Sequence, residues 1–212
     1  MRKLFLASYF TEVASLLPDF IEGSCIGKKV IVIPTAALHE EVTFYVDTDR
    51  TSLQNLGLIV EELEISNVTY EVIEKSLSNT DFVFVGGGNT FFLLQELKRT
   101  GTDKLIIEHI NKGKPYISTS AGSIILSKDI GFAADTDSPD VAPHLKGDFS
   151  ALSIIDFYVF PHYANVEMEK LNEQTLNKYA DTLDFKLIMD NQVVIVEDEK
   201  VEIITAKGEC NK

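Results

Sequence analysis

Apolar runs of strand length alternate with helix-like segments along the first 127 residues, and this alternation restricts the possible folds most strongly. The apolar runs lie at 3–7, 29–34, 58–63, 81–85 and 116–118. Between them, apolar residues recur at helical spacing, for example at 12–22. Apolar strands that alternate with helices are typical of a parallel sheet covered by helices on both faces. We therefore predict an α/β fold.

The rest of the chain is less regular at first and then returns to strands. Residues 127–153 carry aspartates, glycines and prolines with little periodicity, which predicts loops with a hairpin. Strand-like runs, an amphipathic helix and a terminal hairpin follow at 156–160, 168–182, 185–189 and 193–205. No repeat or linker divides the chain, so we expect a single domain over residues 1–212.

Composition argues against several classes of protein. The 33 acidic and 19 basic residues give a net charge of −14, which suits neither nucleic acid nor an anionic membrane. No apolar stretch reaches the roughly 18 residues of a membrane helix, and the apolar start lacks a cleavage-type sequence, which predicts a first strand rather than a signal peptide. Cys25 and Cys210 form neither a disulfide framework nor a metal-ligand spacing. They fit a reducing, cytoplasmic setting.

The segment 115–126 joins a short strand to a helix through a block of small residues. Ser120 stands at the centre of its Ser-x-Ser-x-Gly pattern. A serine at a sharp strand-to-helix turn projects its hydroxyl above the sheet, and the next amide, that of Ala121, can then face an oxyanion. Serines in such a block also serve as ordinary helix N-caps. This segment alone leaves both interpretations open.

Three more polar sites follow predicted strands, namely Gly86-Gly87-Gly88, His162 and Asp190. Ligands of open parallel sheets bind at the carboxyl ends of the strands, so we expect these sites and Ser120 at one edge of the sheet. In an acyl-transfer site, Ser120 would attack, His162 would take and return its proton, and Asp190 would orient the imidazole. Each site alone is explained as a turn, a helix cap or a solvated loop. Their coincidence favours catalysis.

The glycine triplet and the other histidines suggest little else. The triplet is not a dinucleotide-binding fingerprint, because Phe91 occupies the third glycine position, and it lacks the lysine of a phosphate loop. His39 follows the second predicted strand and is placed to line the pocket. His109 falls in a predicted helix and His144 in the irregular segment, and we expect both on the surface.

The motifs Gly-Gly-Gly-Asn-Thr, Ser-Ala-Gly and Phe-Pro-His together resemble those of peptidase E (aspartyl dipeptidase) and its serine peptidase relatives, which include cyanophycinase. The resemblance covers essentially the whole chain. It implies a flavodoxin-like, mostly parallel sheet of the class I glutamine amidotransferase type, with helices on both faces and serine replacing cysteine at the elbow. The family needs no metal or cofactor, and we expect none here.

The resemblance also implies roles for individual residues. Ser120 would be the nucleophile and His162 the base. The oxyanion and substrate-binding residues would be Gly87, Gly88, Asn89 and Ala121, with the amides of Gly88 and Ala121 as the oxyanion donors.

Two aspartates compete for the third place in the triad. Asp135 lies fifteen residues after Ser120, a spacing similar to that of an aspartate sometimes assigned in the family. Asp190 matches the glutamate of the family's Ser-His-Glu interpretation. Because Asp135 belongs to an irregular acidic stretch, where a carboxylate is solvated and loops hold geometry poorly, we hypothesise that Asp190 orients His162.

One departure from the family concerns specificity. Aspartyl dipeptidases carry an arginine after the histidine that holds the substrate's aspartate, whereas Lys170 and Lys178 are the only cations of residues 163–178. We predict a serine dipeptidase or exopeptidase that acts on short peptides, as a monomer or homodimer, with a weak preference for aspartate. The alternatives are an amidase or cyanophycinase-like hydrolase, and a non-catalytic module that binds an anion or other ligand at a helix N-terminus.

Overall fold

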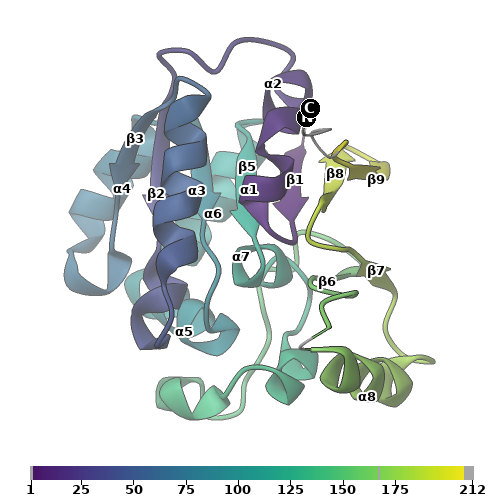
Figure 1. Cartoon of the computed structure of the whole chain (residues 1–212). Helices are drawn as coiled ribbons and strands as arrows, with labels where there is room; N and C mark the ends of the chain where they lie inside the picture. The colour runs from purple at the N-terminus through teal and green to yellow at the C-terminus, as the bar shows by residue number, and fades with distance from the viewer. Residues whose placement is uncertain (1, 167, 208–212) are drawn as a thin grey trace.

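The computed structural model describes residues 2–166 and 168–207, whose main feature is a seven-stranded sheet of order β3-β2-β4-β5-β1-β8-β9 (Figure 1). Its five parallel strands are β1 (Lys3–Ala7), β2 (Lys29–Ile33), β3 (Ile59–Glu62), β4 (Phe82–Val85) and β5 (Tyr116–Thr119). The antiparallel hairpin of β8 (Gln192–Glu197) and β9 (Lys200–Thr205) extends the sheet beside β1. The predicted mostly parallel α/β sheet with a terminal hairpin is confirmed.

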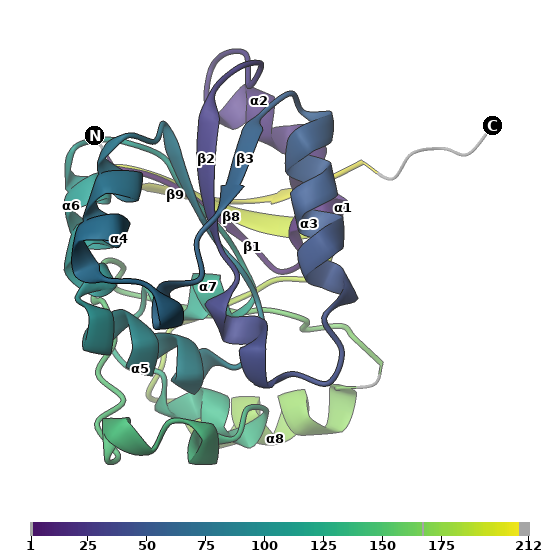
Figure 2. The ribbon, with the colours of Figure 1, turned by 90° about the vertical axis from the view of Figure 1, so that its left-hand side faces the viewer.

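Helices cover both faces of this sheet (Figure 2). One face packs against α1 (Phe10–Val13), the 3₁₀ turn η1 (Ala14–Leu16), α2 (Leu17–Phe20) and α3 (Phe44–Asn55). The other packs against α4 (Tyr70–Ser78), α5 (Thr90–Thr100) and α6 (Thr102–Asn111). Alternate residues of each strand point to opposite faces, so Ile31 and Ile33 join one core and Val30 and Val32 the other. The strands are therefore apolar throughout.

Two predicted elements differ in the structure. The helix expected over 12–22 is divided into short pieces, because Pro18 stands in the first turn of α2 and cannot donate a backbone hydrogen bond to a preceding turn. Residues 127–153 contain no hairpin: the segment forms three 3₁₀ turns and one isolated bridge between Asp129 and Ser150. The turns are η4 (Gly131–Asp135), η5 (Pro139–Val141) and η6 (Pro143–Leu145). Proline begins two of them and interrupts any ladder.

The strands that precede His162 and Asp190 form a second, smaller sheet. β6 (Tyr158–Phe160) and β7 (Phe185–Leu187) pair in parallel with each other and not with the main sheet. Between them in sequence lies α8 (Glu169–Tyr179), which Figure 1 shows next to this small sheet. The expectation that both residues end strands of the main sheet is therefore wrong. Aromatic contacts explain the separate layer, since Phe185 packs against Tyr158, Phe160 and Phe132.

The described residues include no helix that is both long enough and apolar enough to cross a membrane.

Candidate active site

Ser120 occupies the sharp turn between β5, which ends at Thr119, and the short helix α7 (Ala121–Ile124). Its φ of 47° and ψ of −113° lie in a region that residues with a side chain rarely adopt. The amide of Ser120 donates to the carbonyl oxygen of Ala7 at 3.1 Å, which holds the turn against β1. The Ser120 side chain makes no capping hydrogen bond. The interpretation of Ser120 as an ordinary N-cap is therefore wrong.

Glycines let the neighbouring segments approach this turn closely. A Cβ on Gly122 would lie 2.2 Å from the carbonyl oxygen of Val85, which no side chain can tolerate. A Cβ on Gly87 would lie 3.2 Å from the Cβ of Ser120. The end of β4 therefore packs directly against the start of α7, and this packing explains the block of small residues in the sequence.

His162 lies between Ser120 and Asp190 and contacts both. Its Nε2 is 3.1 Å from Ser120 Oγ, and its Nδ1 is 2.6 Å from Asp190 Oδ1. The hydrogen bond from His162 lowers the pKa of the Asp190 carboxyl, although partial burial acts in the opposite direction. A carboxylate kept ionised beside Nδ1 favours the tautomer in which Nδ1 carries the proton, which leaves Nε2 free to accept the Ser120 proton.

Ser8, which directly follows β1, was not predicted from the sequence. Its hydroxyl donates to Asp190 Oδ1 at 3.0 Å and accepts the backbone N–H of His162 at 2.8 Å. The rule used for the other sites could have found it, because the carboxyl end of β1 lies beside that of β5. On the other side, Asn172 of α8 donates to the carbonyl oxygen of His162 at 2.8 Å.

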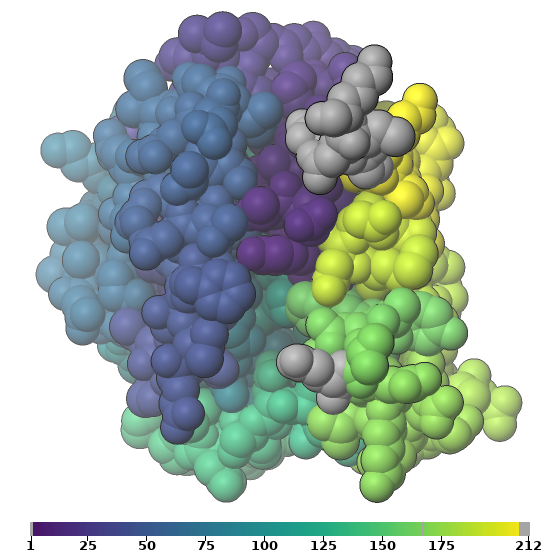
Figure 3. All heavy atoms as spheres, in the orientation of Figure 1, coloured from purple at the N-terminus to yellow at the C-terminus, as the bar shows by residue number. Residues whose placement is uncertain are grey.

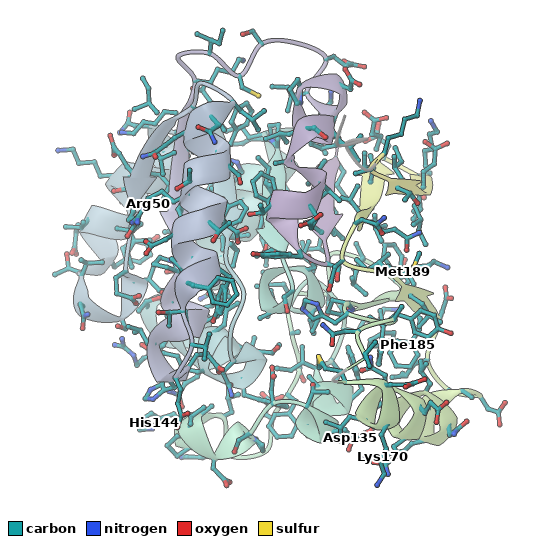
Figure 4. The ribbon with its side chains drawn as sticks, viewed as in Figure 1. Arg50, Asp135, His144, Lys170, Phe185 and Met189 are labelled. Atoms are coloured by element: carbon teal, nitrogen blue, oxygen red, sulfur yellow. The ribbon has the colours of Figure 1, made fainter. Side chains whose placement is uncertain are left out.

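Asp135, the competing aspartate, lies beside α8 (Figure 4) and contacts that helix instead of His162. Its carboxylate accepts from Lys178 Nζ at 3.0 Å and from Thr175 Oγ1 at 3.1 Å, which ties the irregular segment to α8. It does not line the cavity around Ser120. Of the two aspartates, the structure brings only Asp190 to His162.

The glycine turn after β4 supplies backbone N–H groups near Ser120. Among the described residues, neither the Gly88 amide nor the Ala121 amide has a hydrogen-bond acceptor. Gly88 has a φ of +127°, and a Cβ there would lie 2.3 Å from the Ala36 carbonyl oxygen, so the turn requires glycine. Free amides that flank a serine hydroxyl are suited to bind an oxyanion.

The expectation that Asn89 binds substrate is wrong. It is 5% exposed and does not line the cavity. Its side-chain oxygen accepts from the Phe92 amide and its side-chain nitrogen donates to the Ser138 carbonyl, both at 3.0 Å. Asn89 is thus the N-cap of α5, the simpler role that the sequence also allowed.

Ser120, His162, Asp190 and the turn Gly87-Gly88 line one side of a cavity of about 380 Å³. In Figure 3 the surface is hollowed between α3, in blue, and the green segment that follows β6. Tyr45 and several carboxylates line the same cavity. No group of histidine, cysteine and carboxylate side chains that could hold a metal ion occurs within the described residues.

The remaining histidines lie away from this cavity. His39 is exposed and packs edge-on against Phe92, with their ring centroids 4.3 Å apart. It does not line the cavity, so the expectation that it lines the pocket is wrong. His109 is buried rather than on the surface, because its face of α6 packs towards the sheet. Its Nε2 bonds to the Pro115 carbonyl at 3.0 Å, and burial lowers its pKa to about 4. His144 is exposed, as expected.

Comparisons with known proteins agree with this fold. The family model described as "Peptidase family S51" matches residues 4–204. An uncharacterized peptidase of Listeria innocua is 43% identical over 211 residues, which span all of both chains. Peptidase E of Shewanella oneidensis is 34% identical over 149 residues, which cover 70% of this chain and 59% of that protein.

A crystal structure provides the corresponding comparison of folds. It is that of a protein assigned to peptidase E from Listeria monocytogenes EGD-e, with a TM-score of 0.93 and 40% sequence identity. The alignment covers 98% of this chain and all of that one. The chain therefore belongs to peptidase family S51, as the resemblance of its three motifs to peptidase E predicts.

Proposed function

We propose that this serine peptidase cleaves short peptides through an acyl-enzyme on Ser120, with His162 as general base and Asp190 as its orienting carboxylate. The observation that carries the proposal is the continuous contact from Asp190 Oδ1 through both ring nitrogens of His162 to Ser120 Oγ. A nucleophile, a base and an orienting group in hydrogen-bond contact are the parts that acyl transfer requires.

The reaction would proceed in two halves. His162 Nε2 takes the Ser120 proton while Ser120 Oγ attacks the peptide carbonyl carbon, and the oxyanion that forms accepts hydrogen bonds from the Gly88 and Ala121 amides. The C–N bond then breaks, the proton passes from His162 to the leaving amine, and the acyl group remains on Ser120. In the second half, His162 takes a proton from water, the hydroxide oxygen attacks the ester, and the acid product leaves as Ser120 regains its proton.

The size and charge of the cavity bear on the substrate. A volume of about 380 Å³ is at the small end of the range for ligand sites, which favours short peptides. Within the described part of the chain, no lysine or arginine lines it, and Lys178, the last cation of the segment that replaces the family's arginine motif, is paired with Asp135. We therefore propose that N-terminal aspartate is not strongly preferred. The same lack of cations argues against a module that binds anions.

The setting and oligomeric state belong to the same proposal. Cys25 is buried with a free thiol, which supports a reducing, cytoplasmic location. A monomer and a homodimer are both compatible with a cavity whose candidate groups all come from one chain.

A hydrolysis panel tests this function directly. Wild type and Ser120→Ala are assayed on dipeptides and tripeptides, and both are treated with a fluorophosphonate probe. We expect cleavage and labelling by wild type and neither by the variant. A wild-type protein that fails to label and cleaves no peptide would contradict the proposal, as would turnover that survives in Ser120→Ala.

A further inference from the structure

Three carboxylates line the same cavity as the candidate triad. Asp49 of α3 is the deepest, at 2% exposed, Asp137 is partly exposed, and Glu40 lies at the exposed mouth. Among the described residues that line the cavity, no lysine or arginine balances them. We call these three residues the acidic wall of the cavity.

Within the described residues, histidines offset the charge of this wall only in part: His162 lowers the pKa of Asp137 and His39 lowers that of Glu40, but burial outweighs both. Burial raises the pKa of Asp49 to about 7, and burial also raises the pKa of Asp137. Burial and the nearby Asp137 charge raise the pKa of Glu40. Carboxyl groups whose loss of water outweighs the nearby positive charge shift in this direction, and an added full positive charge would reverse the shift.

One hydroxyl group of the same cavity also lacks a partner. The hydroxyl oxygen of Tyr45 is buried and has no hydrogen-bond partner among the described residues, and the pKa of Tyr45 is raised to about 12 by burial and by the three carboxylates. The buried Thr90 hydroxyl lies beside Asp137 and helps to lower the pKa of that carboxyl. Buried hydroxyls without a partner are costly, and ligand binding is one reason for a protein to keep them.

The structural roles of two of these carboxylates do not account for their charge. Asp137 Oδ2 accepts the Thr90 amide at the start of α5 at 2.8 Å, and Asp49 Oδ1 accepts from Thr11 Oγ1 at 3.0 Å. A neutral asparagine could accept either hydrogen bond through its side-chain oxygen. Neither hydrogen bond therefore requires an ionisable side chain.

From this arrangement we infer that the cavity selects peptides whose acyl-donating residue is basic, with a lysine or arginine side chain directed at Asp137 and Glu40. The inference rests on Ser120 being the nucleophile, because the acyl-donating residue is the one held beside it. A free α-ammonium group neutralises one carboxylate at most, whereas the wall has three. A basic side chain supplies the second positive charge and a donor for the unpaired Tyr45 hydroxyl.

The test compares arginine with its neutral isostere. Hydrolysis of Arg-Leu and citrulline-Leu is measured for wild type, for Asp137→Asn and for the control Asp140→Asn. The control removes the same charge three residues away, at an exposed position outside the cavity. We expect wild type and the control to favour Arg-Leu at least tenfold in kcat/KM. Asp137→Asn should lose most of that ratio.

A binding measurement separates this inference from the proposed function. Calorimetric titration of Ser120→Ala with both dipeptides reports charge selectivity without turnover. If Ser120→Ala binds Arg-Leu selectively but wild type hydrolyses no peptide, the proposed function is overturned and the inference stands. Hydrolysis of both dipeptides at equal kcat/KM, or an Arg-Leu preference that persists unchanged in both Asp137→Asn and Glu40→Gln, would overturn the inference alone.

Discussion

Ser120 and His162 meet at 3.1 Å, and both have a left-handed backbone, with φ of 47° and 57° respectively. The end of β1 holds both residues, since the Ala7 carbonyl accepts the Ser120 amide and the Ser8 hydroxyl accepts the His162 amide. Such conformations cost on the order of 1–3 kcal/mol each and persist only where the surroundings enforce them. The end of β1, a strand that carries no candidate catalytic group, thus fixes the distance between Ser120 and His162.

Substitution of Ser120 should therefore affect stability and activity in different ways. Ser120→Ala and Ser120→Gly both remove the hydroxyl, and we expect both to abolish hydrolysis. Glycine relieves the strain of the positive φ but loses more chain entropy on folding, so Ser120→Gly should be more stable than Ser120→Ala by about 1 kcal/mol. Urea denaturation of the two variants measures this difference. A less stable glycine variant would show that the turn is not strained.

His162→Ala should resemble Ser120→Ala in activity. Residues that act as a unit are not additive in kinetics, so the double variant should be no worse than either single one. The measurement is residual kcat on one verified peptide for all three proteins. A double variant that is slower than both single variants by tenfold or more would mean that the two side chains act independently.

Much of the fold and part of the site could be predicted from the sequence, for identifiable reasons. Parallel strands buried on both faces are apolar throughout, which made β2 and β4 recognisable without knowledge of their partners. Ser120 was found because a close approach of α7 to β4 requires small residues, and that requirement is visible in the sequence. The positions of His162 and Asp190 were expected because both follow strand-like segments.

Other features depended on contacts that sequence spacing does not encode. The assignment of β6 and β7 to the main sheet failed because Phe132, far from both strands in sequence, packs with Phe185 in a separate layer. An asparagine can either cap a helix or contact a substrate, and the sequence does not distinguish the two roles. The hydrogen bond from the Phe92 amide to the Asn89 side chain identifies Asn89 as a helix cap. The acidic wall went unnoticed because Asp49 and Asp137 come from distant elements.

The two candidate orienting aspartates can be separated by matched substitutions. Asp190→Asn leaves an amide in contact with His162 and favours the wrong tautomer, so kcat should fall by on the order of 10⁴. Asp135→Asn loses only an ion pair with Lys178 and should stay within a few-fold of wild type. Steady-state kinetics on a single peptide compares them. The assignment fails if Asp135→Asn is the crippled variant and Asp190→Asn is not.

Ser8→Ala tests whether the end of β1 positions the base. The variant loses the hydroxyl that bonds to Asp190 and leaves the His162 amide without its acceptor. We expect kcat to fall by about tenfold to a hundredfold with little change in KM, because orientation and not substrate contact is lost. Ser8→Thr keeps the hydroxyl and should recover part of the rate. Equal losses in the alanine and threonine variants would indicate a packing effect instead.

The pH dependence of stability should depend on Asp49. Burial raises its pKa from the ordinary value near 3.8 to about 7, so the folded protein holds this proton more tightly than the unfolded chain. A carboxyl group whose pKa is raised by folding favours the folded state below about pH 4, and that contribution to stability is lost as the pH rises towards 7. A shift of this size corresponds to at most about 4 kcal/mol. Asp49→Asn still accepts the Thr11 hydroxyl but cannot ionise.

The difference in unfolding free energy between Asp49→Asn and wild type isolates this one group, because all other titrating groups are common to both proteins. It should increase by about 2–4 kcal/mol in favour of the variant between pH 4 and pH 8, as measured by urea denaturation at each pH. Asp47→Asn, at an exposed position of the same helix, should show no comparable increase. A difference that stays constant across this range would mean that Asp49 ionises without penalty in the folded protein. The acidic wall would then already be solvated, and a basic substrate would gain little by replacing its water.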